Sequence, residues 1–120
     1  MEKIEIKNKN GSVIYSHNCM NNTLAKTVEN AVRNGISLCG ANLINADLQN
    51  ANLCNADLRC ANLRNANLRY VSLYNADLRC ANLRNANLCR SHLQSANLHS
   101  AILINTNLRS ADLTYTKFWQ

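Results

Sequence analysis

Residues 56–68 read ADLRCANLRNANL, and the same letters recur at residues 76–88, twenty positions further along the chain. This block is part of an uninterrupted run of seventeen five-residue units at 36–120. Leucine occupies the centre of sixteen units, every fifth residue over 38–113, and Phe118 takes the last centre. Alanine usually stands two residues before each centre, with Asn or Asp between the two.

A period of five residues fits neither an amphipathic helix, whose period is 3.6, nor a flat strand, whose period is 2. Leucines spaced by five would spread around the whole circumference of a helix, so no face could be buried. Each unit must therefore turn a corner, with its Ala and Leu inside. The recurrence after twenty residues equals four units, so we expect four units to form one coil and equivalent residues to stack in successive coils.

The run from Ala41, AnLinADLqnANLcnADLrcANLrnANL, resembles the pentapeptide-repeat family, whose pattern is A(D/N)LXX. The resemblance implies an all-β solenoid, a right-handed quadrilateral β-helix with four repeats in each coil. It also implies that the central Leu and the residue two positions before it point inward, while the other three face solvent. Departures from the pattern include Ile102 in place of the Asn/Asp and four residues in place of the inner Ala: Val71, Ser91, Thr106 and Thr116. The fold should tolerate all five departures.

The first 35 residues lack the repeat and predict a small cap, so we expect a β-hairpin and capping helix at 1–35 followed by the β-helix at 36–120. KIEIK at 3–7 and SVIYS at 12–16 have the composition of strands. The intervening NKNG predicts the turn of a β-hairpin.

A helix should follow this hairpin, because Asn22 or Thr23 can cap its first turn and Gly35 can end it. An open coil end exposes apolar side chains, so we expect the hairpin and helix to cover the first coil. The alternative is a separate recognition element, whose contacts would be Tyr15 and His17.

The six cysteines and three histidines lack the spacing of a metal or catalytic site. There is no CxxC pair and no Cys/His spacing of a zinc finger, and the cysteines of the repeats fall on three different faces. Only Cys60 and Cys80 are stacked one coil apart, about 4.8 Å by strand spacing. This permits a disulfide, whereas a cytosolic compartment favours free thiols. No glycine follows Gly40 to cradle a phosphate. We expect no catalytic residue, metal or cofactor, and no enzymatic activity.

Charge bears most directly on function. The best-known members of the family that this chain resembles protect gyrase from quinolones and mimic B-DNA with an acidic surface, whereas this chain has a formal net charge of +6. Arg59 and Arg79 share a face with Asp57 and Asp77, so these charges should largely neutralise one another.

Arg64 and Arg84 stack on the next face without neighbouring acids, since Asn62 and Asn82 flank them. The face after that adds three more arginines. We call the five residues the basic edge: Arg64, Arg84, Arg69, Arg90 and Arg109. Either they form an ordinary solvated surface or they meet an acidic partner. A column of asparagines shares the face of Arg64 and predicts a hydrogen-bonded ladder at a corner: Asn45, Asn65, Asn85 and Asn105.

Three functions compete. The first is a non-enzymatic module, a rigid rod that presents the basic edge to an acidic protein; the resemblance implies an inhibitor, such as a phage or bacterial blocker of a host defence complex. The second is nucleic-acid binding along the arginines, although aromatic residues for base stacking are sparse in the repeats. The third is DNA mimicry at a topoisomerase, which the net charge opposes because a mimic needs the charge sign of phosphate.

The expected location is the cytoplasm, of a bacterium or of an infected host cell. No stretch of about 18 apolar residues could cross a membrane, and the first residues, MEKIEIKNKN, lack the apolar core of a signal peptide.

The last repeats predict an assembly contact. Tyr115, Phe118 and Trp119 cluster there, and exposed apolar surfaces of this kind often mark interfaces, most commonly two-fold ones. Related pentapeptide proteins dimerise through their C-terminal coils, so the resemblance also implies a homodimer. We expect Phe118 in the last core layer and Tyr115 and Trp119 at the seam. The alternative is that Trp119 folds over the coil end as a lid.

Overall fold

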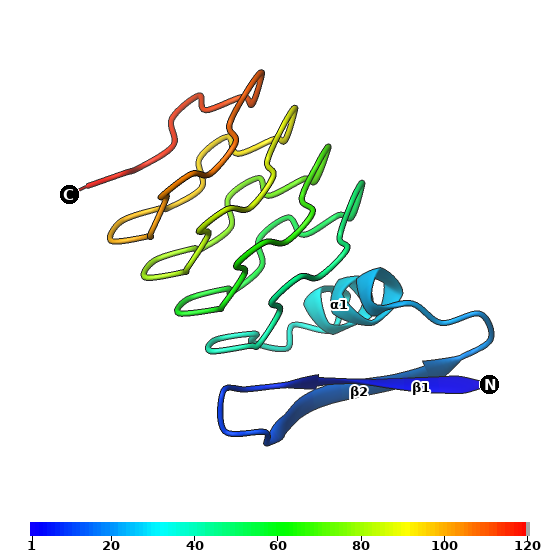
Figure 1. Cartoon of the computed structure of the whole chain (residues 1–120). Coiled ribbons are helices and arrows are strands. Elements are labelled where there is room, and N and C mark those ends of the chain that lie inside the picture. The colour runs from blue at the N-terminus through cyan, green and yellow to red at the C-terminus, as the bar shows by residue number, and fades with distance from the viewer. Residues whose placement is uncertain (120) are drawn as a thin grey trace.

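The computed structural model describes residues 1–119 and shows a stack of coils with a hairpin and a helix at one end (Figure 1). Strands β1 (Glu2–Lys7) and β2 (Val13–Cys19) pair antiparallel, and helix α1 (Leu24–Arg33) follows them. The N-terminus lies at the hairpin end and the last coil at the opposite end. The molecule extends over 40 × 26 × 24 Å.

The predicted hairpin is confirmed, and its turn is tightly bonded. Ile6 lies opposite Tyr15, and the register shifts between Ile6 and Lys7. In the turn, the side-chain Oδ1 of Asn8 accepts hydrogen bonds from the backbone N–H groups of Asn10 and Ser12, at 2.9 and 3.1 Å. The glycine of NKNG has a φ of 82°, a conformation that glycine adopts without steric cost.

The predicted helix is also confirmed. Thr23 is its N-cap, with Oγ1 accepting from the Lys26 N–H at 3.1 Å, and Gly35 follows its end with a φ of 70°. Val28 and Ala31 on its inner face are fully buried in the same apolar core as the leucines of the repeats. The helix therefore packs onto the first coil, as a cap must.

Asn22 and Tyr15 hold the cap together. Asn22 does not cap the helix; its buried amide Nδ2 donates to the carbonyls of His17 and Glu2, at 2.7 and 3.2 Å. The Tyr15 hydroxyl donates to Oδ1 of Asn30 on α1. The Tyr15 hydroxyl thus joins β2 to α1, which fits the predicted cap, while the alternative of a recognition element with contacts at Tyr15 and His17 stays a prediction.

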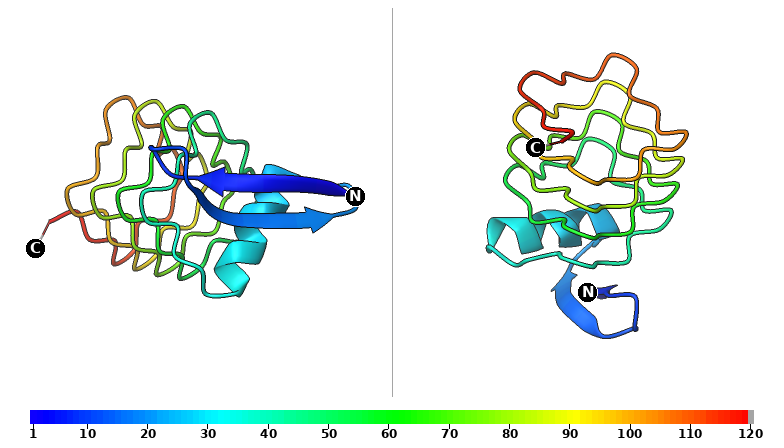
Figure 2. Two further views of the ribbon diagram at one scale, coloured as in Figure 1. Left: turned by 90° about the horizontal axis from the view of Figure 1, so that it is seen from below. Right: turned by 90° about the vertical axis from the view of Figure 1, so that its left-hand side faces the viewer.

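Each coil contains four repeats, as the twenty-residue recurrence predicts. Parallel bridges join residues exactly one coil apart, from Asn42 with Asn62 through to Asn97 with Lys117. The coils follow one another as similar rectangular outlines when viewed from below (Figure 2). Each bridge involves a single residue pair, so the sides of the coil are too short to count as continuous strands. The solenoid is confirmed, and its right-handed turn stays an implication of the family.

The inward register of the repeats is confirmed for the core. The central leucines of the repeats from Leu38 to Leu98 are at most 1% exposed, and the inner alanines over 41–96 are at most 3% exposed. Burying each leucine contributes about 1.5–3 kcal/mol, which offsets the entropy of ordering the turns. In the last coil, Leu103, Leu108 and Leu113 are only half-buried, because no further described coil covers them.

The Asn/Asp before each central leucine caps the main chain. Its side-chain Oδ1 accepts the N–H of the residue two positions further on, as in Asn62 with Arg64 at 3.2 Å and Asn107 with Arg109 at 3.0 Å. Short Asn and Asp side chains make such local bonds readily. Ile102 cannot make this bond.

The second residue after each leucine adopts a left-handed backbone. Its φ is 61° at Asn45 and 60° at Asn65 and Asn85, and the N–H of Ala46 closes the turn on the Leu43 carbonyl at 3.1 Å. This is the pattern of a type II β-turn. Asparagine is frequent there because it tolerates this region better than most side chains.

The predicted asparagine ladder at this corner is wrong in one respect. Its hydrogen bonds are made by the main chain, such as Asn65 N–H to the Arg84 carbonyl at 3.0 Å. No side-chain hydrogen bond joins these asparagines within residues 1–119. A side-chain bond of that kind occurs on another face, where Asn75 Nδ2 donates to Asn55 Oδ1 at 2.9 Å.

Candidate protein-binding face

Arg64 and Arg84 lie side by side in successive coils. Their backbones are joined through the bridge between Asn62 and Asn82, and both side chains are exposed. Within residues 1–119 neither guanidinium makes a salt bridge. We call this side of the coil the Arg64 face; its central leucines are Leu43, Leu63, Leu83 and Leu103.

Arg59 and Arg79 on the preceding face are neutralised as predicted. Arg59 donates from Nε and Nη2 to the two oxygens of Asp57, at 2.7 and 2.8 Å. Arg79 donates from Nε and Nη2 to the two oxygens of Asp77 in the same way, at 2.9 and 2.6 Å. These side-chain hydrogen bonds hold the pKa of both aspartates below the usual value and raise the pKa of both arginines. This face therefore offers little net charge to a partner.

Because of the Asp57–Arg59 and Asp77–Arg79 pairs, we expect the folded protein to lose stability in acid. The folded-state pKa of Asp57 and Asp77 is lower than the unfolded value of about 3.9, so the pairs stabilise the fold above that pH and lose this contribution as the pH falls toward the folded pKa. We expect the melting temperature to fall between pH 5 and pH 2.5. The fall should be smaller by a few degrees in Asp57→Asn with Asp77→Asn, since exposed pairs contribute little.

The control for this experiment is Asp47→Asn. Asp47 makes no salt bridge within the described residues, and asparagine preserves its Oδ1 bond to the Gln49 N–H. Thermal melts by circular dichroism at each pH give the comparison. An acid dependence that is identical in the double variant and the wild type would contradict a contribution from these pairs.

The other three arginines of the basic edge lie on the face that follows Arg64. Arg69 and Arg90 both approach the ring of Tyr70, each with its guanidinium carbon 5.9 Å from the ring centroid. Arg90 Nη1 also donates to the Tyr70 hydroxyl at 3.0 Å. Arg109 is exposed one coil beyond Arg90. The structure thus arranges the basic edge on two adjacent faces and adds Tyr70, which the sequence pattern did not connect with it.

All six cysteines are free thiols, and Cys39, Cys60 and Cys80 are exposed. Within residues 1–119, no group of three His, Cys, Asp or Glu side chains is placed to hold a metal ion. The same part of the chain contains no helix long and apolar enough to cross a membrane.

The aromatic residues near the last coil divide into two kinds. Phe118 is half-buried against the core, whereas Tyr115 is 83% and Trp119 78% exposed. The rings of Phe118 and Trp119 are 6.3 Å apart at their centroids. The alternative of Trp119 as a lid is wrong in this structure, because most of its side chain lies in solvent.

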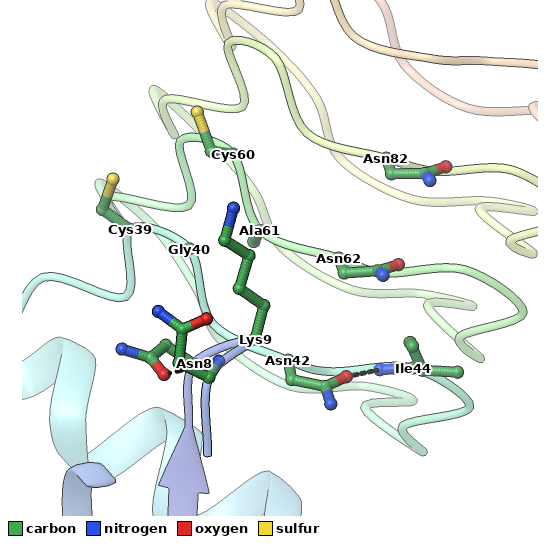
Figure 3. A pocket seen from close by; sticks show the side chains of 11 residues that line it. Asn8, Lys9, Cys39, Gly40, Asn42, Ile44, Cys60, Ala61, Asn62 and Asn82 are labelled. Carbon is green, nitrogen blue, oxygen red and sulfur yellow. Dashed lines mark hydrogen bonds between the residues drawn. The ribbon is translucent and has the colours of Figure 1, made fainter. Parts of the chain in front are cut away.

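The structure also contains a cavity that sequence reasoning did not predict. A cavity of ≈ 550 Å³ lies between the hairpin turn and the first coils, and Lys9 of the turn lines it together with Asn42, Asn62 and Asn82 (Figure 3). The sequence shows a lysine, Lys9, at the tip of the turn. It does not show that Lys9 lies beside asparagines more than thirty positions further along the chain.

Comparison with known proteins fits this architecture. The family model described as Pentapeptide repeats matches residues 29–59, 56–94 and 91–120, with eight copies. The chain belongs to the pentapeptide-repeat family. No curated protein matches it significantly.

Solved structures of other pentapeptide repeat proteins are also similar in sequence. The chain is 35% identical to alr5209 from Nostoc Pcc 7120, over 82% of this chain and 86% of that one, with a TM-score of 0.40. It is 32% identical to Rfr23 from the cyanobacterium Cyanothece 51142, over 71% and 65%, with a TM-score of 0.38. It is 35% identical to HetL from Nostoc sp. strain PCC 7120, over 62% and 37%, with a TM-score of 0.32. The chain thus spans about two thirds of the length of Rfr23 and about a third of that of HetL.

Proposed function

We propose that this pentapeptide-repeat protein is a non-enzymatic binding module that presents its basic edge to an acidic surface of a protein partner in the cytoplasm. The observation that carries the proposal is the contrast between two arginine pairs. Arg59 and Arg79 are held by aspartates, whereas Arg64 and Arg84 are exposed, adjacent and without an acid in the described chain. An acidic partner would supply the missing counter-charges and would be steered toward them.

The scaffold suits such a role because its surface is pre-organised. On the Arg64 face, main-chain bonds join every coil to the next, as in Leu63 N–H to the Asn82 carbonyl at 2.8 Å and Leu83 N–H to the Ile102 carbonyl at 2.9 Å. A surface that is already ordered loses little conformational entropy on binding. Occupying a partner's acidic surface in this way would make the protein an inhibitor, such as a phage or bacterial blocker of a host defence complex.

The test is a matched pair of charge-removing variants. Partners are first captured from the native host with the wild-type protein, and their affinity is then measured. Arg64→Gln with Arg84→Gln should weaken binding at least tenfold, because two cations facing the acidic surface are lost. Arg59→Gln with Arg79→Gln should change it less than threefold, because these charges are already paired. Equal losses in the two variants, at unchanged melting temperature, would contradict the assignment.

Nucleic-acid binding is the second candidate, favoured by Tyr70 between Arg69 and Arg90. Base stacking beside cations is a common mode of single-strand binding. Retention on heparin and on DNA at two salt concentrations separates the candidates, since phosphate contacts give a steep salt dependence. DNA mimicry at a topoisomerase is opposed by the net charge of +6.

We also propose a homodimer through the last described coil, because Tyr115 and Trp119 are exposed beside the half-buried Phe118. Large exposed aromatic side chains are typical of interface centres. Light scattering at micromolar concentration should give twice the chain mass for the wild type and one chain mass for Tyr115→Ala with Trp119→Ala. A monomeric wild-type protein rules the dimer out.

A further inference from the structure

The hairpin turn forms one wall of a cavity on the Arg64 face. The cavity of ≈ 550 Å³ lies at the corner of the first coils, a size that is typical of ligand-binding sites. The Lys9 side chain extends from the turn alongside Ala61 (Figure 3). Beside it, the amides of Asn42, Asn62 and Asn82 form a row across three successive coils.

The turn that carries Lys9 is fixed in position. Asn8 pairs with Ala41 of the first coil through an antiparallel bridge, and the Asn42 N–H donates to the Lys7 carbonyl at 2.7 Å. Inside the turn, the Asn8 N–H donates to the Ser12 carbonyl at 2.9 Å. The backbone of Lys9 is therefore anchored to the coil, which places the base of its side chain at the corner.

The three amides of the row are oriented by their own bonds. Oδ1 of Asn42, Asn62 and Asn82 accepts the N–H two residues further on, at 3.3, 3.2 and 3.1 Å. This assigns the oxygen to the inner side of each amide and leaves Nδ2 as the free donor. None of these Nδ2 groups makes a hydrogen bond within residues 1–119, whereas Nδ2 of Asn67 on the next face bonds Asp47 and Gln49.

The chemistry of the cavity favours a carboxylate. No carboxyl group lines it, Lys9 has no salt bridge in the described chain, and Arg64 and Arg84 follow the amides of Asn62 and Asn82 by two residues. A carboxylate is acceptor-only and binds several donors at once. The lining contains the apolar side chains of Ile44 and Ala61, which suit the aliphatic stem of an acidic side chain. It contains no aromatic ring on which the base of a nucleotide could stack.

We propose that this cavity receives an acidic side chain of the partner protein, with Lys9 as its counter-charge and the amides of Asn62 and Asn82 as hydrogen-bond donors. The inference rests on the proposed function, since the partner's chain must lie along the Arg64 face. It assigns to the hairpin a role in recognition besides covering the first coil.

Two variants test the cavity without disturbing the fold. Lys9→Glu reverses an exposed charge at the tip of the turn. Asn62→Ser removes the free amide donor without adding a charge that would pair with Arg64, and its hydroxyl oxygen can still accept the Arg64 N–H, as Ser37 does for Cys39 at 3.2 Å. The matched control is Asn97→Ser, at the same repeat position on the face of Asp77, where Oδ1 accepts the His99 N–H at 3.0 Å.

Fluorescence anisotropy measures binding of a labelled oligoglutamate peptide and of an oligothymidylate of equal charge. Lys9→Glu should weaken peptide binding about tenfold and Asn62→Ser about fivefold, with Asn97→Ser within twofold of wild type. In a titration followed by NMR, the side-chain amide signals of Asn62 and Asn82 should shift, and that of Asn97 should not.

The outcomes separate this inference from the proposed function. If Arg64→Gln with Arg84→Gln weakens peptide binding but Lys9→Glu and Asn62→Ser do not, the cavity is not the site and the inference is overturned alone. If none of these variants changes binding, both fail. If oligothymidylate binds more tightly than the peptide and Lys9→Glu abolishes that binding, the occupant is nucleic acid and the assignment to an acidic side chain is wrong.

Discussion

Leu63→Asp is expected to unfold the protein. Leu63 is fully buried between the layers of Leu43 and Leu83, with no polar group of the core to receive a carboxylate. Burying an unpaired charge costs several kcal/mol, and the apolar contacts of the leucine are lost as well. The sum approaches the total stability of a small domain, about 5–15 kcal/mol. Circular dichroism should show no cooperative melting transition at room temperature or above.

The control for this prediction is the neighbouring substitution Asn62→Asp. It introduces the same side chain one residue earlier, where the residue faces outward and where Asp47 of another repeat makes the main-chain bond that Asn62 makes here. Its melting temperature should stay within a few degrees of wild type. Cooperative melting of Leu63→Asp at the wild-type temperature would contradict the inward register of the leucines.

Asn65→Pro is expected to be the second most damaging change. Asn65 has a φ of 60°, whereas proline is locked near −65°. Its N–H donates to the Arg84 carbonyl at 3.0 Å, and proline has no N–H to donate. The turn would have to rearrange and the bond to the next coil would be lost, at a cost of at least about 3 kcal/mol by analogy with proline inside a helix.

Asn65→Gly separates this backbone effect from the loss of the side chain. Glycine adopts a positive φ without steric cost and keeps the N–H, so its unfolding free energy should change by less than about 1 kcal/mol. Urea denaturation of both variants gives the comparison. Equal midpoints for Asn65→Pro and Asn65→Gly would mean that the left-handed turn does not contribute to stability.

The period of the sequence determined the solenoid. Leucines every five residues and the exact recurrence after twenty define which residues are buried and which are stacked, because every coil repeats the same backbone path. The pairing of Arg59 with Asp57 was predictable for a related reason. The two residues are only two positions apart, so a single turn brings their side chains together whatever the rest of the chain does.

The tertiary structure decided what lies beyond this period. The period stacks Tyr70 against Arg90, but only the tertiary structure shows that the guanidinium groups of Arg69 and Arg90 both approach the Tyr70 ring. The asparagine corners likewise depend on a positive φ that sequence spacing does not reveal. The position of Lys9 depends on how the hairpin packs against the first coil through Ile6 and the Asn8 bridge. This packing has no repeat to extrapolate from, because it depends on the shapes of non-repeating side chains that meet only once in the molecule.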